Sequence, residues 1–394
     1  MSPDVGDAPA AWGAARRGEW ALIPGLAYLN HGGFGLTPLA VLAAADAWRR
    51  RIEENPTRFM AREVRPASRA AAARVGARLG AEGDDIVFSD NATTAVNAVL
   101  RSLRFHPGDE ILTTGLGYNA VRNTVRYVAE LCGAKAVEVP VPLPVADADA
   151  IVAAVASRLS ARTRLVVLDH IASHSAIALP LARLIPLARQ VGARVLIDGA
   201  HVPGQMPLDL RALGADYYAA NLHKWYFAPR GTAILWARRE LQAELHPQTI
   251  SHGLGQGFHA EFDWTGTRDP SAWLAAPTGI EFHERLGGER LMARNRDLAQ
   301  EMGRMLAQSW GTPLAAPESL FAAMTVVALP LAGAATQERA IEVRNHLSEV
   351  HKIEAAVNAM SGRLWVRIAA QAYNEPAEYE RLRDAVRSLH SASR

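Results

Sequence analysis

Cysteine is nearly absent from this chain of 394 residues. The single cysteine, Cys132, excludes a disulfide bond within the chain and predicts a reducing, cytoplasmic environment. Long apolar runs are missing too, because Asp169, His170 and Arg183 interrupt residues 165–188, and a membrane span needs about 18 apolar residues in a row. Residues 1–20 lack a basic segment followed by an apolar one, so we expect no signal peptide. These absences predict a soluble cytoplasmic protein with no membrane partner.

An excess of charge of either sign is also lacking. The 42 Lys and Arg residues are balanced by 40 Asp and Glu residues, which gives a formal net charge of +2. This balance offers no electrostatic case for a nucleic-acid partner. The remaining composition, 49% apolar and 21% charged, is that of an ordinary globular protein whose length allows more than one domain.

Lysine is the third scarce residue, since only three of the 42 basic residues are lysines, at positions 135, 224 and 352. Arginine stays protonated in proteins, whereas a lysine amine can lose its proton and form a Schiff base. Lys224 stands in the sequence Asn221-Leu222-His223-Lys224-Trp225. A lysine retained there is a candidate for amine chemistry.

Amphipathic segments rich in alanine and arginine alternate with short β-branched segments from about residue 85 to residue 236. The periodicity predicts helices over 38–55, 66–79, 94–103, 119–132, 147–159 and 181–191. It predicts strands over 86–88, 110–113, 136–139, 165–169, 195–198, 217–220 and 232–236. This alternation is typical of an α/β fold with a mostly parallel sheet between helices.

The pattern changes after about residue 276. A long helical stretch over 276–309 is predicted, followed by strands over 324–329 and 364–368 and by helices over 336–350 and from residue 376 onward. Segments in this order indicate a separate, smaller α+β domain.

Several reactive side chains fall where strands of the predicted sheet end. Asp198 ends one apolar strand, Lys224 follows the next, and Asn91, Ala92 and Thr93 open a helix after the first. Ligands of open α/β sheets bind beyond the carboxyl ends of the strands, and free N–H groups at a helix start bind phosphate. An amine for an aldehyde, a carboxylate for a pyridine nitrogen and a phosphate cradle are what pyridoxal 5′-phosphate requires.

On these residues the chain resembles the class V aminotransferase family of fold-type I pyridoxal-phosphate enzymes, nearest its isopenicillin N epimerase-like branch. The resemblance covers roughly residues 26–385 and rests on motifs at 29–35, 54–56, 91–94, 115–120, 198–201, 221–225 and 265–267 and on Arg367. It implies an N-terminal arm (1–30) that joins the small domain, a large cofactor-binding domain (31–275) and a small C-terminal domain (276–394). It also implies a homodimer with shared active sites.

The resemblance further implies a role for each matching residue. Lys224 would form the Schiff base and move protons, Asp198 would pair with the pyridine nitrogen, and Tyr118 would stack on the ring. Near the phenolic oxygen we expect His201 and Ser173.

The phosphate and the substrate have implied partners as well. The phosphate would be bound by Asn91, Ala92, Thr93, Asn221 and His223, and by Thr267 from the neighbouring subunit. Arg367 would bind the substrate α-carboxylate through two parallel hydrogen bonds. Other residues expected near the substrate are Asn30, Phe34 and Arg58.

Three further patterns give weaker evidence of function. His170 and His174 are four residues apart but follow a strand, where that spacing does not bring side chains together, so no metal site is predicted. The glycines of 253–257 do not lie between a strand and a helix, which favours a flexible active-site loop over a nucleotide site. Cys132 lies near a helix end, far from the C-terminal loop where a desulfurase of this family carries its nucleophile, and this argues against a cysteine desulfurase.

The reaction stays open at this point. Epimerisation or C–S β-elimination at Cα of an α-amino acid or its conjugate, in secondary metabolism, is our interpretation of the residues. Transamination and a decarboxylating or oxidatively deaminating variant are the alternatives. Epimerisation needs a proton donor on the face opposite Lys224, whereas elimination needs only Lys224 and a leaving group. A cofactor-free scaffold and a nucleotide-binding regulator are the alternatives outside enzymes.

Overall fold

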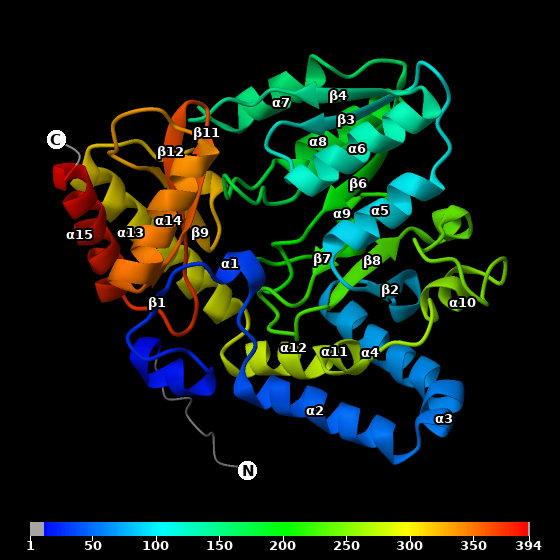
Figure 1. Cartoon of the computed structure of the whole chain (residues 1–394). Helices are drawn as coiled ribbons and strands as arrows, with labels where there is room; N and C mark the ends of the chain where they lie inside the picture. Colours follow the sequence, from blue (N-terminus) through cyan, green and yellow to red (C-terminus); the bar gives the residue numbers. More distant parts are fainter. Residues whose placement is uncertain (1–11, 393–394) are drawn as a thin grey trace, which may run out of the picture.

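The chain folds into a large α/β domain and a smaller C-terminal domain, as the computed structural model of residues 12–392 shows (Figure 1). The strands are β1 (Ala27–Tyr28), β2 (Ile86–Ser89), β3 (Glu110–Thr114), β4 (Lys135–Val139), β5 (Thr163–Asp169), β6 (Arg194–Asp198), β7 (Tyr217–Asn221), β8 (Ala233–Ala237), β9 (Met324–Ala328), β10 (Ile353–Glu354), β11 (Ala356–Met360) and β12 (Arg363–Ala369). The predicted α/β fold is confirmed.

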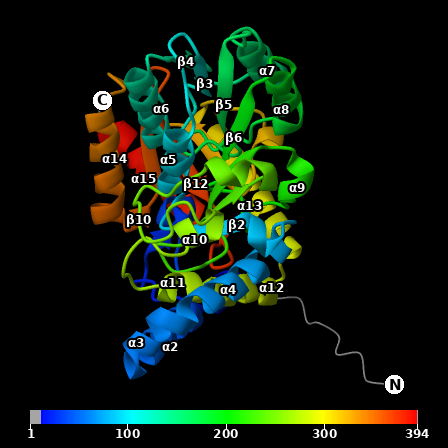
Figure 2. The ribbon, with the colours of Figure 1, turned by 90° about the vertical axis from the view of Figure 1, so that its right-hand side faces the viewer.

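The α-helices connect and cover these strands. They are α1 (His31–Phe34), α2 (Leu39–Glu54), α3 (Pro56–Arg58), α4 (Val64–Arg78), α5 (Ala92–Ser102), α6 (Asn119–Cys132), α7 (Ala148–Ala156), α8 (Leu181–Gln190), α9 (Leu210–Leu213), α10 (Phe258–Phe262), α11 (Ser271–Leu274), α12 (Ala276–Arg285), α13 (Glu289–Trp310), α14 (Gln337–His351) and α15 (Pro376–Ala392). Among them, α2, α3 and the start of α4 form a helical projection, whereas the end of α4 packs on the core of the large sheet (Figure 2).

Within the described residues the large sheet has seven strands in the order β2-β8-β7-β6-β5-β3-β4. Strands β7, β6, β5, β3 and β4 are parallel neighbours, and β8 runs antiparallel to β7 and β2. Because parallel strands end at the same edge, the ends of β3, β5, β6 and β7 lie together there.

Alternation along the central strands produces two cores, one on each face of the sheet. On β5, Leu165 and Val167 pack with residues of α5 and α6, whereas Val166 and Leu168 pack with residues of α7 and α8. A strand that is buried on both faces reads as a continuous apolar run, which is how the sequence reads here.

Side-chain caps stand at the starts of α5 and α7. Asn91 Oδ1 accepts a hydrogen bond from the Thr94 N–H at 2.8 Å, and Asp147 caps α7 in the same way at 2.8 Å. Side-chain caps of this kind satisfy N–H groups that have no partner inside the helix. The Asn91 cap fixes where α5 begins, and this sets the position of a candidate phosphate site.

The small domain contains a three-stranded antiparallel sheet in the order β11-β12-β9, packed against α13, α14 and α15. The helical stretch predicted over 276–309 is present as two helices, α12 and α13. Gly287 (φ +113°) and Gly288 (φ +54°) interrupt it between α12 and α13, because both adopt backbone conformations that do not continue a right-handed helix.

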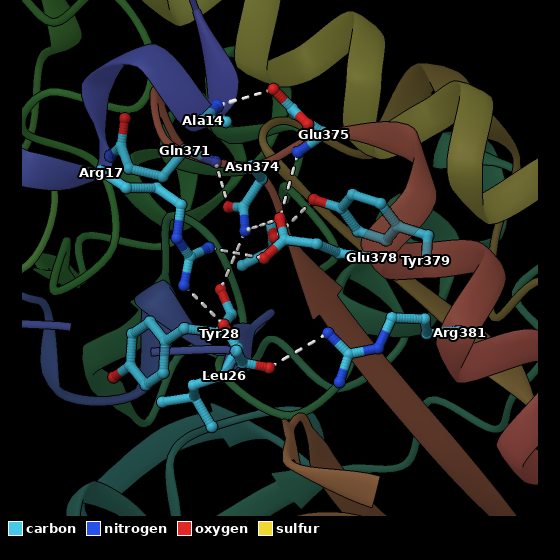
Figure 3. A network of polar contacts seen from close by, with 12 residues as sticks. Ala14, Arg17, Leu26, Tyr28, Gln371, Asn374, Glu375, Glu378, Tyr379 and Arg381 are labelled. Carbon is cyan, nitrogen blue, oxygen red and sulfur yellow. Dashed lines mark hydrogen bonds and ion pairs between the residues drawn. The ribbon is translucent and has the colours of Figure 1, made fainter. Parts of the chain in front are cut away.

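The N-terminal segment packs against the C-terminal domain (Figure 3). Strand β1 pairs in parallel with β10. Arg17 donates to Glu378 Oε1 at 2.8 Å and to the Leu26 carbonyl at 2.7 Å, and Asn374 donates to the Tyr28 carbonyl at 3.1 Å. The exact domain boundaries remain a prediction, and of the predicted arm residues 1–11 lie outside the described residues.

The other predicted elements of the large domain are present, with ends that differ by a few residues. Strands β1, β10 and β11 were not predicted, because two of them are very short and β11 alternates only weakly in hydropathy. In the part of the chain that the structure describes, no helix is both long and apolar enough to span a bilayer.

Candidate active site

A cavity of about 460 Å³ lies at the carboxyl edge of the large sheet. Asp169 and Asp198, the last residues of β5 and β6, are register partners there, and Asn221 ends β7 beside them. Most of the predicted site residues line the cavity, and the full lining is Gly33, Phe34, Asn91, Ala92, Thr93, Thr94, Tyr118, Asp169, Ser173, Asp198, Ala200, His201, Asn221, His223 and Lys224.

Lys224 is buried in this cavity, with 8% of its surface exposed. Its Nζ lies 3.1 Å from His201 Nε2. Burial, together with the nearby Arg367 guanidinium, lowers the pKa of the Lys224 amine to about 7, although Asp198 and Asp169 act in the opposite direction. An amine with such a pKa is partly unprotonated near neutral pH and can act as a nucleophile or base.

His201 is the neutral partner of this amine. Burial first, and then the positive charge of Lys224, lower the pKa of His201 well below its ordinary value. When the lysine is protonated it donates to Nε2, and the hydrogen of the neutral ring then lies on Nδ1. Nδ1 is buried and has no hydrogen-bond partner among the described residues. A buried donor without a partner points to a ligand atom or a water molecule at this position.

Asp198 and Asp169 form a buried pair of carboxyl groups. Asp198 Oδ1 accepts a hydrogen bond from the Ala200 N–H at 3.0 Å. Burial raises the pKa of Asp198, and burial together with the neighbouring Asp198 charge raises the pKa of Asp169 well above its ordinary value. A cationic ring nitrogen beside Asp198 would relieve this cost of burial.

The start of α5 forms the opposite part of the cavity wall. Asn221 Oδ1 accepts from the Ala92 N–H at 2.9 Å, which ties the helix start to the end of β7. Asn91, Thr93 and His223 lie around the same helix end. The positive end of the dipole of this 11-residue helix favours an anionic group there, although the Ala92 and Thr94 N–H groups already donate to Asn221 and Asn91.

Aromatic side chains border the cavity mouth. Tyr118 precedes α6 and is partly exposed, and its ring lies 6.2 Å from the ring of His174. Phe34 follows the α1 glycines and is 72% exposed, which is unusual for a large apolar side chain beside a cavity.

Arg367, on β12 of the small domain, lies beside the site and contacts Ser173 of its wall, although neither Arg367 nor Asn30 lines the cavity itself. The Arg367 side chain is buried and donates to the Ser173 carbonyl oxygen and to Asn30 Oδ1, the latter at 2.9 Å. Burial lowers its pKa to about 10, so it stays protonated at neutral pH. Its Nε has no partner among the described residues, and a buried guanidinium without a carboxylate partner is suited to bind one.

Asp169 and His31 were not predicted as residues of the site. Asp169 carries the same signal as Asp198, a carboxylate at the end of an apolar strand, and this signal was present in the sequence. His31, fully buried, lies 2.8 Å from the Tyr373 hydroxyl through Nδ1 and 3.0 Å from the Lys224 carbonyl through Nε2. No local sequence signal identifies the second of these contacts.

Glycine at position 35 allows this close approach. Gly35 has φ +67°, and a Cβ there would lie 1.9 Å from the His223 carbonyl oxygen. The segment 30–35 can therefore pack directly on the backbone that carries Lys224.

Thr267 and Arg58 do not line the cavity. Thr267 lines a separate cavity of about 310 Å³ with Asp90 and Thr94, and Arg58 is exposed in the helical projection, where it pairs with Glu63 at 2.7 Å. His170, one of the two histidines considered as metal ligands, lies with its Nδ1 2.9 Å from the Tyr218 hydroxyl. No group of three or more potential metal ligands occurs in the described part of the chain.

Pyridoxal phosphate fits these residues: an amine with a lowered pKa, a buried carboxyl group, the start of α5 and the unpartnered His201 Nδ1 surround one cavity. Cys132, in contrast, packs beside the core beneath α5 and α6 and does not line the cavity.

This chain is similar to several known proteins. The model of the aminotransferase class-V family matches residues 27–381. The putative L-cysteine desulfhydrase 1 of Oryza sativa subsp. japonica is 36% identical over 402 residues, covering 93% of this chain and 83% of its own length. Isopenicillin N epimerase of Streptomyces clavuligerus is 32% identical over 400 residues, with 97% and 99% coverage. The structure of the cystine C–S lyase C-DES with cysteine persulfide superimposes with a TM-score of 0.80 at 25% identity, covering 92% of this chain and 97% of that one.

Proposed function

We propose, since this chain belongs to the aminotransferase class-V family of pyridoxal-phosphate-dependent enzymes, that it catalyses β-elimination at the carbon–sulfur bond of an L-cysteine derivative. The observation that carries the proposal is the single buried amine of Lys224, held 3.1 Å from His201, with Arg367 near enough to lower its pKa. One base and one carboxylate-binding cation are what such an elimination requires. The names of the desulfhydrase and the C–S lyase support the carbon–sulfur bond as its target.

The cofactor would be held by side chains of the cavity wall. Asp198 would face the pyridine nitrogen, Tyr118 the ring, and Ser173 and His201 the phenolic oxygen. The phosphate would be bound by Asn91, Ala92, Thr93, Asn221 and His223. Bound there through Lys224, pyridoxal phosphate supplies an electron sink for the negative charge left at the substrate Cα.

The chain's own groups would then bind the substrate and move one proton. Arg367 and Asn30 hold the substrate α-carboxylate at the small-domain side of the cavity. Lys224 Nζ takes the proton from Cα, which its lowered pKa permits near neutral pH. The C–S bond breaks with its electron pair on sulfur, which leaves as a thiol after protonation. The resulting 2-aminoacrylate takes up water and gives pyruvate and ammonium.

Product analysis in deuterated water tests this proposal. The purified protein is loaded with pyridoxal phosphate and incubated with L-cysteine and S-substituted L-cysteines. We expect pyruvate and free thiol in equal amounts. Lys224→Ala should lose both the visible absorbance of the bound cofactor and the products, whereas Lys135→Ala, at an exposed lysine of β4, should keep them. Dependence on a 2-oxo acid would mean transamination, and release of carbon dioxide would mean a decarboxylating variant; either outcome contradicts elimination.

Epimerisation is the second candidate, and His174 favours it. This histidine lies beside Tyr118 at the cavity mouth and has no hydrogen-bond partner among the described residues, so it is a candidate carrier of the second proton. Isopenicillin N epimerase also aligns over nearly the whole chain. Deuterium at Cα with inverted configuration and without pyruvate would establish epimerisation in place of elimination.

We also propose a cytoplasmic homodimer. Thr267 lies outside its own chain's cavity, as expected of a residue that reaches the phosphate of a neighbouring subunit. The exposed Arg58 and Phe34 would approach the substrate in the same assembly. Sedimentation of the holoenzyme tests the dimer, and Thr267→Ala should weaken cofactor binding only if the subunits share their sites.

A further inference from the structure

A second and larger space adjoins the catalytic cavity. It has a volume of about 760 Å³ and lies between residues 115–123 of the large domain and residues 358–361 of the small domain; we name it the outer cleft. Tyr118 lines both spaces, and His174 lines the outer cleft beside it. A side chain that extends from a substrate past Tyr118 would therefore enter the outer cleft.

Neutral polar side chains make up about half of the lining of the outer cleft, beside apolar residues such as Leu116, Val141 and Met360. Carboxamides come from Asn119 and Asn123 on α6, Gln337 on α14 and Asn358 on β11. Each carboxamide offers both a donor and an acceptor, the pattern that pairs with another amide.

The charge of the cleft is largely neutralised. Arg122 is the cation in its wall, and it binds Glu138 through two hydrogen bonds, of 3.0 and 2.5 Å. Among the described lining residues there is no aspartate or glutamate. The surface therefore offers no site for a cation and favours a neutral polar group.

An unsatisfied hydroxyl in the same wall points to a ligand. Ser175 is 1% exposed, and its Oγ has no hydrogen-bond partner among the described residues. A buried hydroxyl without a partner is unfavourable, so a polar group supplied from the cleft would stabilise it.

The small domain covers the cleft through the turn between β11 and β12. Ser361 adopts φ +45° in this turn, and its Oγ accepts a hydrogen bond from the Leu143 N–H at 3.0 Å. This contact fastens the turn to the large domain. A volume of this size is typical of sites for drug-sized molecules, whereas the side chain of free cysteine ends at its sulfur and would leave the cleft unused.

We propose that the outer cleft binds the sulfur-linked tail of the substrate, and that this tail is uncharged and peptide-like, with at least one amide group. The inference rests on the proposed function and names its substrate class: L-cysteine S-conjugates with an amide-bearing tail. In the elimination described above, the tail leaves as its thiol, and the cysteine carbon skeleton leaves as pyruvate.

Binding of inert ligands tests the proposal. The ligands are α-methyl-L-cysteines, which lack the Cα proton, with either an S-linked glycinamide-containing tail or a hydrocarbon tail of equal length. Calorimetry on the holoenzyme should give about tenfold tighter binding of the amide tail, as one or two neutral hydrogen bonds produce. Asn358→Leu and Ser175→Ala should each reduce this ratio, with the α-methyl-L-cysteine affinity unchanged. Asn345→Leu, at an exposed residue of α14 outside the cleft, should keep it.

Equal affinity for the two tails in the unmodified enzyme would overturn the proposal, as would a ratio that neither Asn358→Leu nor Ser175→Ala changes. The two proposals fail separately. If L-cysteine yields pyruvate and the tails bind equally, the substrate class is wrong and the lyase stands. If no pyruvate forms from any cysteine derivative while the amide tail still binds more tightly, the cleft stands and elimination is wrong.

Discussion

Lys224 loses hydration when it is buried beside Arg367 and His201, and it thereby changes from a permanent cation into a group that titrates near neutral pH. The same burial acts on folding. The folded-state pKa of about 7 lies below the unfolded value of about 10.5, so the folded protein binds fewer protons between these pH values. Above pH 10.5 burial of the neutral amine therefore costs no stability. Stability is lost as the pH falls from 10.5 through the folded-state pKa of about 7.

Replacing Lys224 with methionine should consequently stabilise the cofactor-free protein. We expect a gain in the free energy of unfolding on the order of a few kcal/mol at pH 6, and a smaller gain at pH 9. Urea unfolding of the cofactor-free protein and the variant at both pH values measures it. A gain that does not depend on pH would show that packing, and not desolvated charge, is responsible.

His31 joins the two domains through both ring nitrogens. Because a carbonyl oxygen only accepts, Nε2 must donate to the Lys224 carbonyl, and Nδ1 must accept from the Tyr373 hydroxyl. Burial lowers the pKa of His31 to about 3, which keeps this neutral form at all physiological pH values.

His31→Leu should therefore leave two buried polar groups without partners. We expect a loss of about 2–4 kcal/mol in unfolding free energy, against about 1 kcal/mol for Tyr373→Phe, which removes one donor. Urea unfolding measures both variants. Equal losses would show that the hydrogen bond from His31 to the Lys224 carbonyl adds no stability.

At the scale of elements, α5 combines a structural cap with a candidate anion site. Asn91→Asp should preserve the acceptor that caps the helix and should place a negative charge where the phosphate would bind. We expect about tenfold weaker binding of pyridoxal phosphate, with unchanged stability of the cofactor-free protein. Absorbance titration of the cofactor-free protein measures the affinity. Asp147→Asn, at the cap of α7, serves as the matched control, and an unchanged affinity of Asn91→Asp would exclude the phosphate from this helix end.

Elements with a strong local signal could be predicted from the sequence. The strands that end at Asp169 and Asp198 are continuous apolar runs, and α6 begins and ends where the periodicity placed it. The interruption at Gly287 and Gly288 was missed because amphipathic periodicity continues across it, while the break depends on backbone conformation. Strand β11 was missed because its own residues alternate only weakly, and its pairing with the next strand, β12, across the turn at residues 361–362 stabilises it more than its composition does.

The residues of the candidate site divide in the same way, into those with a local sequence signal and those without one. Lys224, Asp198 and the α5 residues were predicted because each lies at a strand end or helix start, and the structure places them around one cavity. The contact between Asn30 and Arg367 joins segments over 330 residues apart, so a local sequence pattern could not predict its geometry. Thr267 and Arg58 lie outside this cavity, and their predicted roles stay predictions that depend on a second subunit.

At the scale of the whole molecule, ion pairs and hydrogen bonds fix the N-terminal segment to the C-terminal domain (Figure 3). Arg17→Met should leave Glu378, which is mostly buried, without its cationic partner. We expect a loss of about 1–3 kcal/mol in stability, seen as a lower midpoint of urea unfolding. Arg296→Met, which breaks an exposed pair with Asp297, should have little effect. Similar midpoints for both variants would show that the segment is held by apolar packing alone.

The parallel pairing of β1 with β10 has a consequence for synthesis on the ribosome. Strand β1 can pair with β10 only after residue 354 has emerged, and His31 can contact Tyr373 only later. Domains generally fold as units while the chain is being made, so the large domain can form its sheet before this segment has a place to dock. A chain released early would thus contain Lys224 and a folded sheet but would lack Arg367, and β1 would have no strand partner.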